Sequence, residues 1–225
     1  MDDMGQAGSP IDAASLILMR ECPGTAPQLL IVRRGDSLVF AGGAYVFPGG
    51  RLDPEDGVAG PSRFPDLDPT EAAARIAAIR ETAEETGIVV PAAPDTLVPF
   101  ARWCPPAQEK LTRRFDTRFY LAEAQHGTEP IADGIESSHA FWASAANILD
   151  RCAREEGRVI FPTRRLLERL ARFASFGEAR AQAEALPQRI ISPWVEARDG
   201  EDWLCIPDDA GYPVTSERLV TAFRY

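Results

Sequence analysis

Three glutamates are grouped within residues 80–88 of the chain, which read R-E-T-A-E-E-T-G-I. In an α-helix, Glu81 lies three and four positions before Glu84 and Glu85, so the three carboxylates project from one face. Like charges at this spacing cost about 0.2–0.5 kcal/mol per pair unless a cation or an arginine compensates them. Carboxylate oxygens are preferred ligands of Mg²⁺ and similar ions. The spacing therefore predicts a divalent-cation site, with Arg80 turned about 100° away from Glu81 on the helix.

The helix that carries this cluster has recognisable signals at both ends. Asp68 is an acidic N-cap, the proline after it suits the first helical position, and a glutamate stands at N3. The following run is rich in alanine and ends at Gly87, a residue that adopts positive φ without steric cost. We predict one helix over residues 69–86. Ile76 and Ile79, with neighbouring alanines, are expected to form the apolar stripe that packs on a sheet.

A pair of glycines, Gly49 and Gly50, follows a short apolar strand upstream of this helix. Two glycines after a strand let the backbone approach a ligand or a metal closely. A carbonyl or amide group of this pair is therefore a candidate ligand.

Together these residues resemble the signature of the Nudix hydrolases, G-x5-E-x7-R-E-U-x-E-E-x-G-U, in which U is a bulky aliphatic residue. The residues that fall on this pattern are Gly50, Arg80, Glu81, Glu84, Glu85, Gly87 and Ile88. One departure is Thr82, which stands where an aliphatic residue is usual. The resemblance implies an α/β fold, a Nudix-type α/β/α sandwich with a mixed β-sheet.

The segment between Gly50 and Arg80 has 29 residues, sixteen more than the family pattern. We expect residues 51–67 to be a loop insertion that covers the active site or shapes substrate choice, since long insertions beside catalytic elements are usually functional or disordered. The first glutamate of the pattern is left unassigned. Four residues lie at or next to the counted positions: Glu55, Asp56, Glu71 and Ala72.

The resemblance also implies a reaction and a set of roles. A Nudix hydrolase cleaves the pyrophosphate bond of a nucleoside diphosphate linked to another moiety, with Mg²⁺ or Mn²⁺ as cofactor. Glu84, Glu85 and the Gly49 carbonyl would hold the metal, while Glu81 is a further metal ligand or the base. Three residues are expected to be catalytic: Glu81, Arg80 and Glu136. Arg80 would orient a glutamate of the motif, and Glu136 lies in the loop before Trp142. The number of ions and the identity of the base stay open.

Within the family, the chain is similar to the peroxisomal coenzyme A diphosphatases and their bacterial relatives. The segments F-P-G-G and R-R-F-D-T-R-F-Y-L-A carry this likeness, and the signature that precedes the motif in that group is matched in part. The implied substrate is coenzyme A or an acyl-CoA. ADP-ribose or another nucleotide sugar is the alternative, because Pro105 and Pro106 lie about where some ADP-ribose hydrolases carry a proline. The residues expected to bind substrate are Arg33, Arg34, Arg113, Arg114 and Gly50.

Length and composition are those of a single globular domain. The chain has 225 residues, of which 45% are hydrophobic and 26% charged. We expect a disordered tail over residues 1–10 and one domain over residues 11–225 that ends in a helical extension. There is no apolar run long enough to cross a membrane and no signal-peptide pattern. A net charge of −10 argues against nucleic-acid binding, and four cysteines without paired spacing favour a reducing cytoplasm.

Two other classes of function stay open. The chain could be a Nudix-fold sensor that binds a nucleotide without cleaving it, although such modules often lose a motif glutamate and all three are present here. Alternatively, residues 161–186 could form a helical region that mediates homodimerisation or covers the substrate. Activity measurements and gel filtration would separate these possibilities.

Overall fold

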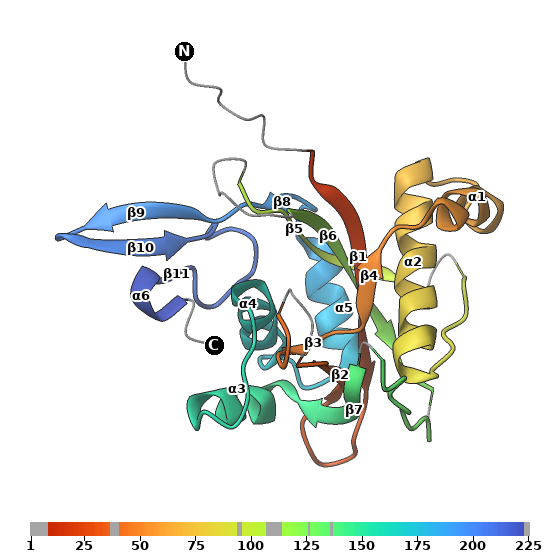
Figure 1. The fold of residues 1–225 in the computed structure, drawn as a ribbon, viewed down its shortest axis with the longest axis horizontal. Coiled ribbons are helices and arrows are strands. Elements are labelled where there is room, and N and C mark those ends of the chain that lie inside the picture. The colour runs from red at the N-terminus through yellow and green to blue at the C-terminus, as the bar shows by residue number, and fades with distance from the viewer. Residues whose placement is uncertain are drawn as a thin grey trace.

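The computed structural model describes residues 9–36, 41–93, 96–106, 114–125, 127–135 and 137–222. Its centre is an eight-stranded sheet with helices on both faces (Figure 1). The strand order is β3-β2-β1-β6-β5-β8, with β4 paired to β1 and β7 paired to β2. The pairs β1–β6 and β5–β8 are parallel and the others antiparallel, so the sheet is mixed. The strands of this sheet are β1 (Ile11–Arg20), β2 (Gln28–Arg34), β3 (Tyr45–Val46), β4 (Gly49–Arg51), β5 (Val98–Trp103), β6 (Phe115–Glu123), β7 (Ser137–Ser144) and β8 (Ile190–Ile191).

The remaining elements are helices on the two faces and a second, smaller sheet. Strands β9, β10 and β11 form this C-terminal sheet in the order β11-β10-β9. Their bounds and those of the helices are α1 (Pro54–Arg63), α2 (Pro69–Thr86), α3 (Ala145–Ala153), α4 (Phe161–Leu170), α5 (Phe176–Ala185), β9 (Trp194–Arg198), β10 (Glu201–Cys205), β11 (Ser216–Arg218) and α6 (Leu219–Ala222). No helix among these is long and apolar enough to span a bilayer.

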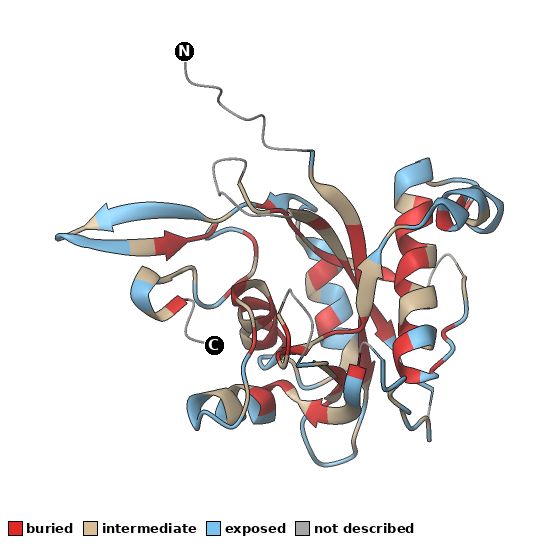
Figure 2. Cartoon of the chain, in the orientation of Figure 1, coloured by how far each residue is buried: buried red, intermediate tan, exposed pale blue. Residues whose placement is uncertain are grey.

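The central strand β1 divides the core into two layers, because successive side chains of a strand point to opposite faces. Leu16 and Leu18 belong to the cluster that includes the alanines of α2. Ile17 and Met19 belong to the cluster on the other face, which contains residues of α4 and α5. The buried residues accordingly follow the central strands and the inner sides of the helices (Figure 2). The expected α/β/α sandwich with a mixed sheet is confirmed.

Helix α2 begins and ends where the sequence predicts. The Asp68 carboxylate accepts hydrogen bonds from the backbone N–H groups of Thr70 and Glu71, at 2.9 and 3.3 Å. At the other end Gly87 has a φ of 69°, in the left-handed region that favours glycine. These caps set the length of the helix and therefore the position of the glutamates in its last two turns.

The buried face of α2 differs from the expected stripe. Ala74, Ala77 and Ala78 are fully buried, whereas Ile76 and Ile79 are only partly buried. Small side chains at the contact allow the helix axis to approach the sheet closely, since interaxial distance depends on the side chains in between. The helix therefore holds its glutamates close to the strands beneath it.

Residues 51–67, expected to be a loop insertion, instead contain helix α1. The carboxylate of Asp56 accepts the backbone N–H of Asp53 at 2.8 Å, which stabilises the first turn. Gly60 faces α2 so closely that a Cβ there would lie 2.6 Å from the Ala73 nitrogen. Glycine and proline within α1 lower its intrinsic helix propensity, but this cap and the packing on α2 override it.

The predicted C-terminal helices are present as α4 and α5, and their leucine and alanine faces are buried in the core. Arg169 of α4 is also buried and donates hydrogen bonds to the Phe100 carbonyl at 2.9 Å and to Gln182 at 2.7 Å. Burial lowers the pKa of this guanidinium. Beyond these helices the chain returns to strands in the small C-terminal sheet, which extends away from the body (Figure 1).

Candidate active site

The candidate site lies where the last two turns of α2 face the glycine pair of β4. The side chain of Glu85 is buried, with 4% of the residue exposed, whereas Glu84 is exposed. The backbone N–H of Gly49 donates a hydrogen bond to Glu85 Oε2 at 3.2 Å. The structure therefore brings the two sequence-predicted parts of the site into direct contact.

The second glycine of the pair leaves room for Glu81. A Cβ at Gly50 would lie 2.6 Å from Glu81 Oε2 and closer still to Oε1. Real Cβ atoms do not approach other heavy atoms to this distance, so a side chain at Gly50 would force the carboxylate to move. The hydroxyl of Ser15 on β1 donates to the Pro48 carbonyl at 2.8 Å and so fixes the turn that precedes the glycines.

Arg80 links the glutamates to the segment that precedes α2. Its Nη1 donates to Glu81 Oε1 and to Glu84 Oε2, both at 2.9 Å. Its Nε and Nη2 donate to the two carboxylate oxygens of Asp56 at 3.1 and 2.9 Å, and Nη2 also reaches the Arg51 carbonyl at 3.1 Å. Although Arg80 starts on a different side of the helix from Glu81, its long side chain reaches both glutamates.

The electrostatics of this guanidinium follow from the same contacts. The hydrogen bonds to Asp56 raise the pKa of Arg80 against the opposing effect of burial, and Glu81 raises it further. Arg80 therefore stays fully charged and offsets the repulsion among neighbouring carboxylates. This is the compensation that three acidic groups on one helix face require.

Asp56, one of the four residues left open for the first glutamate of the pattern, is the one that the structure pairs with Arg80. It lies six positions after Gly50, as the first glutamate of the Nudix pattern does, and only 1% of it is exposed. Among the four residues near the counted positions, it is the one paired with Arg80, whereas Glu71 pairs with Arg75 and Arg118. Two features of the sequence point to Asp56. It stands six positions after Gly50, and it lies three positions after Asp53, a residue type that caps helices.

The donor set of the site suits a divalent cation, but the side chains are arranged around Arg80. Glu81, Glu84 and Glu85 offer hard carboxylate oxygens beside the backbone of Gly49, a set that fits Mg²⁺ or Mn²⁺. Within the described ranges, no three His, Cys, Asp or Glu residues form a group that could hold a metal ion. The reason is visible in the contacts, because Arg80 engages Glu81 and Glu84 while Glu85 accepts the Gly49 N–H.

The predicted substrate-binding arginines differ in their hydrogen-bond partners. Arg33 donates to Asp36 at 2.8 Å and to Ser138 at 3.3 Å. The Nε of Arg34 is buried and has no hydrogen-bond partner in the described structure. Arg114 donates to the Pro105 carbonyl at 3.0 and 3.2 Å, a contact outside the glutamate cluster. Arg113 lies outside the described residues.

Glu136, the other candidate catalytic residue, also lies outside the described residues. The segment before it runs along the end of α2, where the backbone N–H of Asp133 donates to the Glu85 carbonyl at 3.3 Å. On its other side, Ser137 is the register partner of Arg34 on β2. Its predicted role stays a prediction.

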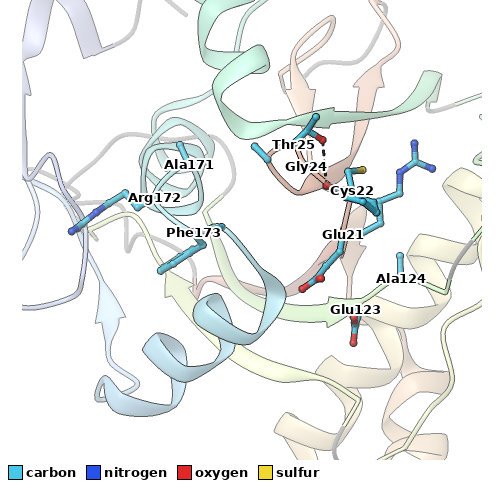
Figure 3. A pocket seen from close by; sticks show the side chains of 13 residues that line it. Glu21, Cys22, Gly24, Thr25, Glu123, Ala124, Ala171, Arg172 and Phe173 are labelled. Carbon is cyan, nitrogen blue, oxygen red and sulfur yellow. Dashed lines mark hydrogen bonds between the residues drawn. The ribbon is translucent and has the colours of Figure 1, made fainter.

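A surface groove of about 900 Å³ lies elsewhere, between the β1–β2 turn, the end of β6 and the α4–α5 connection. Figure 3 shows Glu21 and Cys22 on one side of it and Arg172 and Phe173 on the other. None of its lining residues belongs to the glutamate cluster. The glutamate cluster at α2 and β4, where acidic groups and a close backbone converge, therefore remains the candidate site.

Comparison with known proteins gives a family match over most of the chain. The family model of the NUDIX domain matches residues 10–164. The crystal structure of a NUDIX hydrolase from Alicyclobacillus acidocaldarius is similar, with a TM-score of 0.67 and 27% identity, covering 77% of this chain and 96% of that chain.

Two further structures are less similar. The NUDIX domain of Shewanella oneidensis NrtR, complexed with ADP ribose, has a TM-score of 0.46 and 17% identity, covering 66% of this chain and 89% of that chain. An Ap4A hydrolase from C. elegans has a TM-score of 0.43 and 17% identity, covering 78% and 96%. Among curated proteins, none matches the chain.

Proposed function

Since the chain belongs to the NUDIX domain family and is a hydrolase of that family, we propose that it cleaves the pyrophosphate bond of a nucleoside diphosphate linked to another moiety. The observation that carries this proposal is the contact of Glu81 and Glu85 on α2 with the Gly49–Gly50 backbone, with Arg80 bridging Glu81 and Glu84. A solvated acidic helix face would not need a buried glutamate, a paired arginine and a glycine pair opposite it.

Each residue has a role that follows from its chemistry. Glu84, Glu85 and the Gly49 carbonyl are the proposed ligands of Mg²⁺ or Mn²⁺, with Glu81 as a further ligand. When bound, such a cation supplies positive charge to the pyrophosphate oxygens and lowers the pKa of a bound water. Glu81 or Glu136 would orient the attacking water and accept its proton, because a carboxylate within hydrogen-bond reach is a competent base. Arg80 would hold Glu81 in position.

As the substrate we propose coenzyme A or an acyl-CoA, with ADP-ribose or another nucleotide sugar as the alternative. Coenzyme A carries a 3′-phosphate outside the shared pyrophosphate, so an enzyme selective for it needs an additional cation. Arg33, Arg34, Arg113 and Arg114 are the candidates, since guanidinium groups match phosphate oxygens.

The test compares coenzyme A, dephospho-coenzyme A and ADP-ribose with Mg²⁺ and with Mn²⁺, and with EDTA as the metal-free control. A charge-assisted contact to the 3′-phosphate contributes about 1.5–3 kcal/mol, which corresponds to a preference of roughly ten- to hundred-fold in kcat/KM for coenzyme A over the dephospho form. Equal values for these two compounds and a higher value for ADP-ribose would overturn the coenzyme A proposal alone. Absence of turnover with every nucleotide, together with measurable binding, would favour the sensor class.

We also propose that the reaction takes place in the cytoplasm. All four cysteines are free thiols, as a reducing compartment would maintain.

We further propose that residues 11–225 form one functional unit, because the C-terminal helices contribute to the same core as the sheet.

A further inference from the structure

Ser15 lies on β1 directly opposite the first glycine of the candidate site. In the antiparallel pairing of β1 with β4, it is the register partner of Gly49. The residue is buried, and its hydroxyl donates to the Pro48 carbonyl at 2.8 Å and lies 3.4 Å from the Phe47 carbonyl. A Cβ at Gly49 would lie 2.6 Å from the Ser15 Cα, so the two backbones pack without a side chain between them. A change at Ser15 therefore acts directly on the backbone of the site.

The Pro48 carbonyl also accepts a hydrogen bond from the backbone N–H of Leu16, at 2.9 Å. This bond belongs to the pairing of the two strands and would remain after Ser15→Ala. The serine adds a second donor to the same oxygen, although burial of a hydroxyl carries a desolvation cost that a methyl group avoids. What the serine contributes is therefore a second restraint on the orientation of this carbonyl.

The peptide unit that carries this carbonyl also carries the N–H that holds Glu85. The Pro48 carbonyl and the Gly49 N–H belong to one planar trans peptide, so they point in opposite directions. The carbonyl accepts from Ser15 on β1, and the N–H donates to Glu85 Oε2 on α2 at 3.2 Å. Because the peptide is rigid, any rotation moves both groups together. A donor at the carbonyl oxygen also polarises the amide and makes its N–H a stronger donor.

We propose that Ser15 is a positioning residue of the candidate active site. Through the Pro48–Gly49 peptide it holds the Glu85 carboxylate and the Gly49 backbone in the arrangement that receives the divalent cation. This inference rests on the proposed function, in which these two groups are metal ligands. Loss of a partner that orients a metal ligand typically weakens metal binding about 10- to 100-fold. Because Leu16 keeps its bond to the same carbonyl, the lower end of this range is expected.

Binding of Mn²⁺ to the metal-free chain, followed by electron paramagnetic resonance, tests this role without substrate. Ser15→Ala should raise the Kd for Mn²⁺ about ten-fold. The Mn²⁺ concentration for half-maximal activity should rise by a similar factor, whereas kcat at saturating Mn²⁺ should change little, since excess metal restores occupancy. The matched control is Thr86→Val, which removes a buried hydroxyl that donates to the Thr82 carbonyl at 2.6 Å. This hydroxyl is bonded within α2 and not to the Pro48–Gly49 peptide, so the control should bind Mn²⁺ as the original chain does.

Amide hydrogen exchange in the metal-free protein gives a second readout. The Gly49 N–H should exchange about two- to ten-fold faster in Ser15→Ala, the range that corresponds to one net hydrogen bond, and at the original rate in Thr86→Val. Circular dichroism verifies that both variants are folded. An unchanged Kd for Mn²⁺ in Ser15→Ala, or an equal rise in Thr86→Val, would overturn the role of Ser15 and leave the proposed function intact. Absence of Mn²⁺ binding by the original chain would overturn both.

Discussion

Replacing Asp56 tests whether helix α1 acts on the catalytic motif through Arg80. The Asp56 carboxylate accepts two hydrogen bonds from Arg80, at 3.1 and 2.9 Å, and one from the Asp53 backbone at 2.8 Å. Its side chain is 1% exposed, whereas that of Arg80 is 23% exposed. Alanine at this position would therefore remove a buried partner of Arg80, which would still have its hydrogen bonds to Glu81 and Glu84.

The expected magnitude follows from these contacts. A hydrogen bond to a charged group contributes about 1.5–3 kcal/mol, and a lost helix cap costs about 1 kcal/mol. Because Arg80 is partly hydrated and retains other partners, we expect Asp56→Ala to lower the free energy of unfolding by about 2–4 kcal/mol in total. For a domain of this size, that corresponds to a decrease in Tm of about 4–16 °C. Because Arg80 would then hold Glu81 less firmly, kcat should decrease about ten- to hundred-fold, with a smaller change in KM.

Urea unfolding and steady-state kinetics on the best nucleotide substrate measure both effects. The matched control is Glu55→Ala, the preceding residue, which is exposed on the same helix and should change stability by less than about 0.5 kcal/mol. Asp56→Asn, which retains the shape but not the charge, should fall between the two. If Asp56→Ala and Glu55→Ala have the same free energy of unfolding, and Asp56→Ala has an unchanged kcat, the connection from α1 to the motif through Arg80 is refuted.

Two further substitutions address the glutamates and the strand opposite them. Glu85→Gln removes a charge but little volume, so it should retain the fold and lose kcat by about two orders of magnitude or more; an unchanged kcat at saturating Mg²⁺ would contradict the metal assignment. Gly50→Ala should displace the Glu81 carboxylate and lower kcat by about ten-fold or more with little change in Tm, because the clash is with the end of a side chain. Its control is Gly57→Ala, where a Cβ meets nothing within 4 Å; equal kcat values for the two variants would show that the close approach at Gly50 is unimportant.

Local signals in the sequence were sufficient to predict the helix that carries the candidate site. Its ends depend on Asp68 and Gly87, whose preferences act within one turn of the chain. The grouping of its glutamates depends only on helical periodicity. The α/β/α sandwich with a mixed sheet was implied by the resemblance of this helix and the glycine pair to the Nudix signature, and the sheet with helices on both faces confirms it.

Contacts between distant segments were decided only by the tertiary structure. Spacing alone did not identify Asp56, because the path of the inserted residues determines which acidic side chain returns to Arg80, 24 positions later. Helix α1 was likewise missed, since its stability depends on packing against α2 as well as on its own weak propensity. The order of the strands became visible only in the folded chain, because a sequence shows which residues favour strands but not which strands pair.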